Sequence, residues 1–466
     1  MDTKKLRQKI LDLAIRGKLV PQDPNDEPAS VLLERIRAEK ERLIKEGKIK
    51  RSKKKPSDTP HYENVPFEIP ESWEWIRLED YLLLLSGQDF PPQKYNGDSI
   101  GIPYIIGASN IDKEKLFVNR WTDEPSVISM LNDILVVCKG AGVGKIAMND
   151  VGKVHIARQI QAIRDETGIL DNQYIKICIS SNISEIISNA NGLIPGLKRE
   201  LLLSLMIPIA PITEQHRIVD AVKMMDSLIE GIDTNVCDLL NSISTAKSKI
   251  LDLAIHGKLV PQDPNDEPAI ELLKRINPKF EPCDNAHCTE QLPETWVWTT
   301  LGTLFQHNTG KALNKSDKQE GTLKPYLTTS NVYWNCFDFS EVKEMYFKDT
   351  ELDKCTVSHG DLLVCEGGDI GRAAIWNYDY NICIQNHIHR LRPRGGVNQT
   401  FYLYVLMLYK WKNKIQGNGI GLQGLSSGML DKLEVPLPRL KEQQRIVAKI
   451  EELFAVLDEI KESLEV

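Results

Sequence analysis

Apolar residues recur every three or four positions along two stretches of this chain. Between residues 218 and 253 their spacing alternates between four and three, which is the pattern of a coiled-coil seam. At ~1.5 Å per residue, this seam predicts a helix about 54 Å long. A second seam runs through residues 446–464, and the apolar positions of residues 6–13 continue it at the other end of the chain. The pattern predicts two long antiparallel coiled-coil helices, the second divided between the chain ends.

Parts of the sequence occur twice. Residues 10–29 return as residues 250–269, with Arg16 replaced by His256. The entries to the two seams also match, because Ile-Pro followed by Glu-Gln-x-Arg-Ile-Val occurs in residues 207–219, and Val-Pro followed by the same motif in residues 435–447. A repeat this long indicates two copies of one structural plan. The order of its parts predicts a pseudo-two-fold repeat that is circularly permuted.

Two blocks without helical periodicity separate the seams. They open alike, with Pro-Glu-Ser-Trp-Glu-Trp at residue 70 and Pro-Glu-Thr-Trp-Val-Trp at residue 293. Short apolar runs between turn residues predict mostly β-structure, so the expected fold class is α+β. The predicted organisation is an N-terminal helical segment with a basic linker (1–60), a first β-block (61–212), a central region with the long helix (213–290), a second β-block (291–440) and a C-terminal helix (441–466).

Charge is unevenly distributed along the chain. The whole sequence carries a formal net charge of -7, yet residues 1–60 hold 17 Lys and Arg against 10 Asp and Glu. The basic run from Lys48 to Lys55 is interpreted either as a solvated linker or as an arm that contacts nucleic-acid phosphates. Nine cysteines without regular spacing indicate reduced thiols. With neither an apolar leader nor a run of ~20 apolar residues, we expect a cytoplasmic protein without a membrane span.

Several motifs of catalysis and metal binding are incomplete. Residues 140–146 resemble a phosphate-binding loop, but the first Gly spacing and the final hydroxyl of a Walker A motif are missing, and residues 367–373 depart further. Tight turns between strands are therefore predicted, with Lys145 and Arg372 reaching toward phosphates. The set Cys283, His287 and Cys288 lacks the fourth ligand of a zinc site. We expect no catalytic residue, metal or bound cofactor in this chain.

The ordered motifs resemble one known family along essentially the whole chain. The motifs are the Pro-x-x-Trp-x-Trp openings, the Asp-Ile-Leu-Val and Gly-x-x-Gly-[Lys/Arg] elements, the Glu-Gln-x-Arg-Ile-Val entries, and the Gly-Lys-Leu-Val-Pro-Gln-Asp-Pro segments. Their order, twice over, resembles the DNA-specificity subunit of type I restriction-modification systems.

The resemblance implies two target-recognition domains that each read one half of an asymmetric bipartite site in double-stranded DNA. It also implies a subunit without catalytic activity, on whose helices two modification subunits dock. These partners transfer a methyl group from S-adenosylmethionine to adenine N6, and restriction subunits that use ATP and Mg²⁺ can join them. A helix about 54 Å long suits half-sites about one turn of DNA, ~34 Å, apart.

Residue type then selects candidates for DNA contact, because Arg and Lys suit guanine and phosphates while Asn and Gln suit adenine. Residues 385–392 form a polar cluster of this kind, with Ile384, Ile388 and Leu391 as the expected buried members. The candidates in the first block are Gln88, Gln93, Lys94, Lys113, Lys139, Lys145, Arg158 and Gln159. Those in the second block are Lys311, Asn314, Lys315, Lys318, Asn331, Arg372, Asn386 and His387.

Two alternatives stay open on the sequence. The chain is either a scaffold whose β-blocks bind protein or glycan, or the specificity subunit of a type II-like restriction assembly. A steep loss of DNA binding with salt separates DNA recognition from the scaffold.

Overall fold

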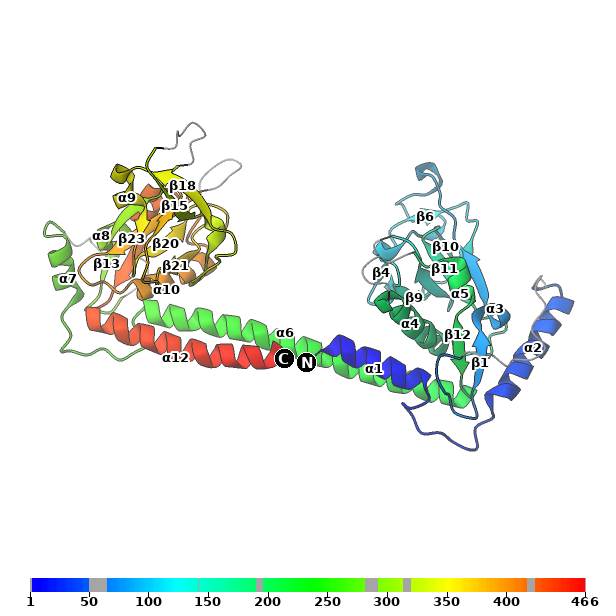
Figure 1. The fold of residues 1–466 in the computed structure, drawn as a ribbon. Coiled ribbons are helices and arrows are strands. Elements are labelled where there is room, and N and C mark those ends of the chain that lie inside the picture. The colour runs from blue at the N-terminus through cyan, green and yellow to red at the C-terminus, as the bar shows by residue number, and fades with distance from the viewer. Residues whose placement is uncertain are drawn as a thin grey trace. The chain divides into compact units, whose positions relative to one another are not determined.

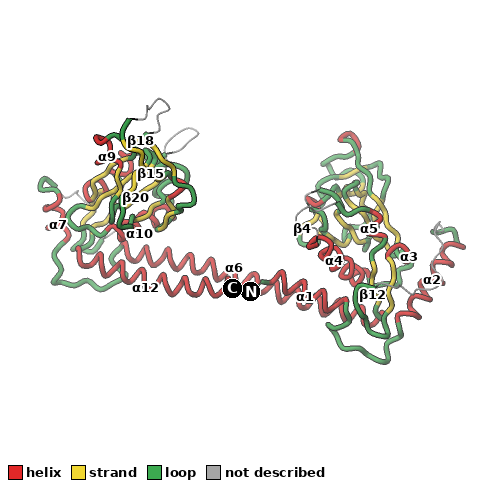
Figure 2. Tube along the Cα trace, in the orientation of Figure 1, coloured by secondary structure: helices red, strands yellow, loops and turns green. Residues whose placement is uncertain are grey.

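The computed structural model describes residues 2–49, 65–140, 142–189, 196–280, 292–312, 320–416 and 424–465. The chain divides into two compact units, residues 1–235 and 236–466, and each combines a β-rich domain with helices (Figures 1 and 2). The expected α+β class is therefore confirmed. Within the described part of the chain, no helix combines the length and the apolar character needed to cross a bilayer.

Unit 1 begins with helices and continues into the first β-rich domain. Its helices are α1 (Thr3–Ile15), α2 (Ala29–Lys45), α3 (Leu78–Tyr81), α4 (Asn172–Asn189), α5 (Arg199–Leu203) and the first part of α6 (Ile212–Ile255). Its strands are β1 (Glu74–Arg77), β2 (Leu83–Ser86), β3 (Ile102–Ile105), β4 (Ile111–Asp112), β5 (Lys115–Leu116), β6 (Trp121–Thr122), β7 (Ile128–Ser129), β8 (Ile134–Val137), β9 (Ile146–Met148), β10 (Val154–Ile156), β11 (Ile160–Arg164) and β12 (Met206–Ile209). Short 3-10 turns lie at Pro92–Lys94 and Ala108–Asn110.

Unit 2 repeats this plan. Besides the remainder of α6, its helices are α7 (Ala269–Ile276), α8 (Leu301–Leu304), α9 (Asp349–Cys355), α10 (Gln399–Trp411), α11 (Ser427–Asp431) and α12 (Leu440–Glu465). Its strands are β13 (Val297–Thr300), β14 (Phe305–Thr309), β15 (Thr322–Leu327), β16 (Val332–Tyr333), β17 (Cys336–Phe337), β18 (Lys343–Phe347), β19 (Thr356–Val357), β20 (Leu362–Cys365), β21 (Ala373–Ile375), β22 (Ile382–Ile384), β23 (Ile388–Pro393) and β24 (Glu434–Leu437). A 3-10 turn lies at Thr329–Asn331.

The two β-rich domains share one sheet topology. In unit 1 the four-stranded sheets have the orders β2-β11-β8-β9 and β6-β3-β10-β7, and β1 pairs with β12. In unit 2 the corresponding orders are β14-β23-β20-β21 and β18-β15-β22-β19, and β13 pairs with β24. The parallel pairing of β3 with β10 is repeated as well, by that of β15 with β22. The duplication predicted from sequence motifs therefore extends to the whole fold of each domain.

Each unit packs one shorter helix against its own part of α6. In unit 1 Arg7 of α1 bonds to Asp233, and Ile10 shares an apolar core with Ile229 and Ile218. In unit 2 Lys247 bonds to Asp458 of α12 at 2.5 Å. Further along α6, Leu251 shares a core with Ile446 and Ile450 near the start of α12, so these two helices run antiparallel.

The apolar seam predicted a long helix correctly, but it did not predict the ends of the helix or all of its buried positions. Helix α6 extends beyond residues 218–253 at both ends. The seam positions Ile232 and Leu239 are 36% and 42% exposed. Near its end α6 buries Leu251 and Ala254 in place of the predicted pair 250 and 253, which are half-buried. There the helix packs against the second β-rich domain, so its buried face follows the period of a straight helix.

A buried polar network joins each domain to the start of a long helix. Glu214, in the first turn of α6, accepts hydrogen bonds from Trp73 Nε1 at 2.9 Å and from Gln22 Nε2 at 2.5 Å. Glu442 of α12 accepts the same pair of bonds from Trp296 and Gln262. These contacts explain why Trp-x-Trp, Pro-Gln-Asp-Pro and Glu-Gln-x-Arg all occur twice, since each motif supplies one member of the network.

Candidate nucleic-acid interface

Four loops gather at one edge of the first β-rich domain. They are residues 87–90 after β2, 106–110 after β3, 138–145 between β8 and β9, of which 141 is not described, and 157–159 between β10 and β11. We call this group the first rim. The topology brings them together because β2, β8 and β11 are neighbours in one sheet while β3 and β10 are neighbours in the other.

Backbone hydrogen bonds tie the loops of the first rim together. Gly87 N donates to Ile160 O at 3.1 Å, and Gln88 N donates to Ile156 O at 2.9 Å. Cys138 N donates to Gln159 O at 2.7 Å. The side chains of the rim are thus carried by a frame that depends on backbone atoms, so their identities can vary while the frame stays the same.

The second domain builds an equivalent second rim from residues 310–312, 328–331, 366–372 and 385–388. Lys311 N donates to Ile384 O at 3.1 Å, as Gln88 N does to Ile156 O. Glu366 N donates to His387 O at 2.9 Å, as Cys138 N does to Gln159 O. The two rims therefore share their backbone frame and differ in the side chains that it carries.

Glycine allows the closest approach in each rim. A Cβ at Gly87 would lie 2.1 Å from Ala157 O, and one at Gly310 would lie 2.0 Å from Ile384 O. Both distances are far below van der Waals contact, so only glycine lets the first loop of each rim lie against the backbone of the fourth.

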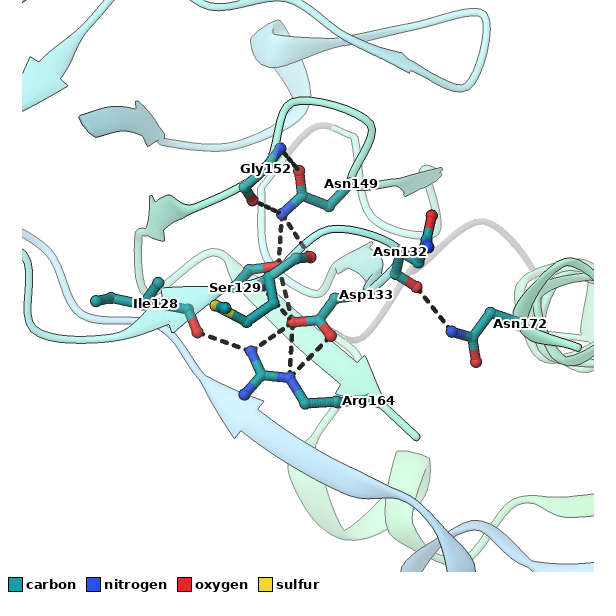
Figure 3. Close-up of polar contacts among 9 residues, drawn as sticks. Ile128, Ser129, Asn132, Asp133, Asn149, Gly152, Arg164 and Asn172 are labelled. Atoms are coloured by element: carbon teal, nitrogen blue, oxygen red, sulfur yellow. Dashed lines mark hydrogen bonds and ion pairs between the residues drawn. The ribbon is translucent and has the colours of Figure 1, made fainter. Parts of the chain in front are cut away.

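A polar network fixes the opposite end of the strands that carry the first rim (Figure 3). Arg164, the last residue of β11, donates to both oxygens of Asp133, with the shortest contact at 2.7 Å, and to Ile128 O at 2.9 Å. Ser129 Oγ also donates to Asp133, and Asn149 Nδ2 donates to Ser129 Oγ at 3.0 Å. In the second domain Arg392 and Asp361 form the same ion pair at 2.7 Å.

A histidine supports the first loop of the first rim from below. Phe90 stacks on the His155 ring with a centroid distance of 4.1 Å. Burial lowers the pKa of His155, which keeps the ring neutral. Its Nε2 lies 3.0 Å from Gln88 O, and its Nδ1 lies 3.3 Å from Val127 N and 3.1 Å from Val127 O. A neutral ring with its proton on Nε2 donates to Gln88 O and accepts from Val127 N.

The structure brings most candidates of the first domain to the first rim or beside it. Gln88, Lys139, Lys145 and Arg158 are exposed on it, and Gln159 is half-buried between its loops. Two further candidates, Gln93 and Lys94, are exposed on the adjacent 3-10 turn. Lys94 bonds to Glu124 at 2.8 Å, and this hydrogen bond lowers the pKa of that carboxyl. Lys113 lies on the separate β4–β5 hairpin, with a positive φ of 44°.

Several candidates of the second domain have structural contacts. The Asn331 side chain is buried, accepts from Thr328 N at 2.9 Å, and so fixes its turn. Lys311 Nζ donates to Tyr346 O at 2.8 Å and pairs with Glu351 at 3.0 Å. On the second rim, Asn386 is half-buried and His387 is exposed. Three candidates, Asn314, Lys315 and Lys318, lie outside the described residues. The cysteine and histidine set at residues 283–288 lies outside them as well.

The two glycine loops form the predicted tight turns between strands, since β8 pairs with β9 and β20 with β21. Lys145 Nζ donates to Ala108 O at 3.3 Å and to Ile111 O at 3.1 Å. Arg372 Nη2 donates to Thr329 O at 2.5 Å. Both cations therefore brace the 3-10 turn of their own rim, and contact with phosphates stays a prediction for them.

Acidic residues on the rims were missed by the sequence reasoning. Asp89 accepts from Arg158 N at 2.9 Å and pairs with its guanidinium at 3.1 Å. Glu366 lies 3.2 Å from His387 Nδ1. A search for cations and amides passed over them, although carboxylates accept from the amino group of cytosine. Their positions next to Arg158 and His387 become visible only when the four loops are assembled.

In the polar cluster of residues 385–392, the expected buried residues are buried, but the strand does not alternate between buried and exposed positions. Ile384, Ile388 and Leu391 are buried as predicted. His389 and Arg390 are buried as well, at 0% and 1% exposure, so this strand carries polar side chains into the interior. Over the described residues, no group of three or more His, Cys, Asp or Glu side chains has the arrangement of a metal site.

Comparison with known proteins agrees with the repeated motifs and the duplicated fold. The family model described as the type I restriction modification DNA specificity domain matches residues 70–236 and 293–466. The specificity subunit of the type I restriction enzyme EcoAI from Escherichia coli is 28% identical, over 98% of this chain and 90% of that relative. The EcoEI specificity subunit from the same organism is 27% identical, over 99% of this chain and 91% of its own.

A solved chain has the same fold. It comes from work on complex assembly and conformational transition of the type I R-M system, and it aligns with a TM-score of 0.59 at 19% identity, covering 86% of this chain and 94% of its own. With matches over most of both units, the chain belongs to the family of type I restriction-modification specificity subunits. It is the non-catalytic subunit that determines DNA sequence specificity, with two target-recognition domains, and this assignment decides against the scaffold alternative.

Proposed function

We propose that each recognition domain reads one half of an asymmetric bipartite DNA site through its rim. The observation that carries this proposal is the shared backbone frame with different side chains. Gln88 of the first rim corresponds to Lys311 of the second, and Cys138 corresponds to Glu366, as the matched backbone hydrogen bonds show. Two readers on one frame with different polar groups fit a target whose halves have different sequences.

Within the rims, the exposed and half-buried polar side chains are the proposed base and phosphate contacts. In the first domain these are Gln88, Lys139 and Arg158, with Gln93 and Lys94 beside them. In the second domain they are Asn386 and His387, with Glu366 as an added acceptor. Base edges are read by hydrogen-bond donors and acceptors, whereas phosphates require only positive charge. Arg158 and His387 are therefore the proposed central contacts of the two halves.

We further propose that the long helices α6 and α12, with α1, form the docking surface for two modification subunits and set the spacer between the half-sites. The relatives are named as subunits of type I restriction enzymes, and this supports assembly with modification subunits that use S-adenosylmethionine. Restriction subunits that use ATP and Mg²⁺ complete the proposed assembly, which acts on DNA in the cytoplasm.

Co-expression with the cognate modification subunit, followed by sequencing that reports N6-methyladenine, tests this function. We expect one asymmetric motif with two defined halves and an unspecified spacer of fixed length. Binding of the complex to that motif should weaken steeply with salt, because Lys and Arg release counterions from phosphates. A stable complex that methylates no defined motif would contradict the proposal.

A further inference from the structure

The second domain contains a cleft with His307 in its wall and a second histidine, His389, buried behind it. The cleft has a volume of about 630 Å³, and its lining includes Thr303, His307, Arg394, Asp431 and Lys432. The His307 side chain is 8% exposed, while His389 behind it is fully buried. The two histidines lie on strands below the second rim, where reading DNA through the rim does not require them.

These histidines stand in series between two hydrogen-bond acceptors. Asp431 Oδ1 lies 2.7 Å from His307 Nδ1. His307 Nε2 lies 3.0 Å from His389 Nδ1, and His389 Nε2 lies 2.7 Å from Leu425 O. The series therefore links α11, β14, β23 and the segment before α11 by three consecutive hydrogen bonds.

Counting protons along this series shows that two neutral rings cannot complete it. Leu425 O only accepts, so His389 must carry its proton on Nε2 and accept at Nδ1. His307 must then donate from Nε2, and a neutral ring would leave its Nδ1 unprotonated, facing Asp431. An ionised carboxylate also only accepts, so the contact at 2.7 Å requires one more proton.

The additional proton belongs to the His307–Asp431 pair. Burial lowers the pKa of His389, which therefore stays neutral. Asp431 is 42% exposed at the mouth of the cleft. The proton thus lies in the contact between His307 Nδ1 and Asp431 Oδ1, while His307 Nε2 donates to His389 Nδ1. The other charged groups that face the pair are Glu366 behind His389 and the cations Arg394 and Lys432 along the cleft.

The first domain provides an internal comparison. In the matched strand pairings, Leu84 lies opposite Ile163 as His307 lies opposite Leu391. By the same registers Gln161 takes the place of His389. Leu203 takes the place of Asp431, because Leu205 and Leu433 accept equivalent backbone bonds two residues later. The shared fold therefore forms without the histidine series, and the series is a property of the second domain alone.

The series ends directly beneath the second rim. Leu425, which accepts from His389, donates its own N–H to Glu366 O at 2.9 Å. Glu366 N donates in turn to His387 O at 2.9 Å, and the Glu366 carboxylate lies 3.2 Å from His387 Nδ1. A continuous path of hydrogen bonds thus runs from the protonated pair to the exposed side chains proposed to read DNA.

We propose that the His307–His389 series is a proton-linked brace that positions the second rim, so that recognition by the second domain, but not by the first, depends on pH. The coupling to recognition rests on the proposed function of the rim, whereas the bound proton does not. Because the folded brace holds a proton that an unfolded histidine, with a pKa of about 6.5, releases, the brace stabilises the second domain less as pH rises.

Hydrogen exchange on the full chain from pH 6 to pH 9, corrected for the chemical exchange rate, tests the bound proton. In the wild-type protein, the opening equilibrium constant of segments 305–309, 388–393 and 425–431 should rise by up to tenfold per pH unit above about pH 6.5, as expected for one proton. Segments 82–86 and 160–164 of the first domain serve as the control in the same sample, and they should lack this rise.

The variant Asp431→Asn gives the sharpest comparison. Its amide supplies an N–H to His307 Nδ1, so all three hydrogen bonds form between neutral groups and the side chain keeps nearly the same volume. The rise with pH should therefore disappear while the segments stay protected. A wild-type protein without the rise, or an Asp431→Asn variant that keeps it, would overturn the brace.

Recognition is tested separately, by the affinity of the complex with its modification subunit for DNA that carries the mapped motif. Between pH 6.5 and 8.5 the wild-type complex should lose several-fold more affinity than the Asp431→Asn complex. Equal losses would overturn the coupling to the rim. If no motif is methylated at all, the proposed function fails, while the exchange experiment still decides whether the brace binds its proton.

Discussion

The ion pair between Asp361 and Arg392 should contribute strongly to the stability of the second domain. Asp361 is 1% exposed and accepts from Arg392 Nε at 2.8 Å, from Arg392 Nη2 at 2.7 Å, and from Ser358 N at 2.8 Å. Breaking a buried ion pair costs about 3–5 kcal/mol, because one charge is left without its partner. Since the Arg392 side chain is 39% exposed and water reaches it, we expect about 2 kcal/mol for Asp361→Asn.

For a unit of this size, such a loss lowers the melting temperature by about 4–8 °C. Calorimetry gives the size of the shift, and hydrogen exchange by mass spectrometry shows which unit is affected. Asp133→Asn is the matched variant, and it should destabilise unit 1 in the same way, because Asp133 is 3% exposed and pairs with Arg164. The exposed pair of Lys94 and Glu124 provides the negative control, so Glu124→Gln should leave the stability unchanged. An Asp361→Asn protein that melts within about 1 °C of wild type would refute the reasoning.

Three further outcomes follow from the structure. Gly310→Ala places a Cβ 2.0 Å from a backbone oxygen and should blur the second half of the methylated motif, whereas Gly367→Ala, with no atom within 4 Å, should leave the motif intact. Burial raises the pKa of Glu442, so its folded form binds a proton more readily than the unfolded chain. Wild type should therefore gain stability over Glu442→Gln as pH falls from 7 to 5 in calorimetric scans. Arg158→Ala should weaken binding of the complex to its motif by about 1–3 kcal/mol, while Lys113→Ala, on a separate hairpin, should weaken binding less. Equal effects of the two variants in a fluorescence titration would argue against the first rim as the reading surface.

The architecture was accessible from the sequence because its main determinants are local and occur twice. Gly17 and Gly257 both have a φ of 65°, and a Cβ there would meet Pro70 and Pro293 at 2.5 and 2.4 Å. The repeated Gly-Lys-Leu-Val motif thus marks a backbone conformation that few other residues adopt. In the same way, the heptad spacing predicted long helices because burial of one helical face requires that period.

The site was only partly accessible, because residue type does not tell where a side chain ends. Asn331 has the composition of an adenine-reading residue, but it turns inward and fixes its own loop with a bond to Thr328 N at 2.9 Å. Lys311 likewise bonds to Glu351 at 3.0 Å, a contact between residues far apart along the chain. Conversely, Asp89 contributes to the first rim only because its loop meets the loop of Arg158. Such contacts depend on tertiary register, which local patterns do not specify.

The histidine series was inaccessible for the same reason. His307 and Asp431 are separated by 124 positions, and neither residue belongs to a recognisable motif. His389 was noted within a polar cluster, but its burial and its partners depend on how β23 lies between β14 and β20. The comparison with Leu84 and Leu203 becomes possible only when strand registers match the two domains residue by residue.

The central claim is that two rims on a shared frame read two different half-sites. Mapping N6-methyladenine in cells that express the modification subunit, with either the wild-type chain, Arg158→Ala or His387→Ala, tests it most directly. We expect Arg158→Ala to relax only one half of the motif and His387→Ala only the other, with the spacer unchanged. Relaxation of the same half by both variants, or an unchanged motif in both, would contradict it.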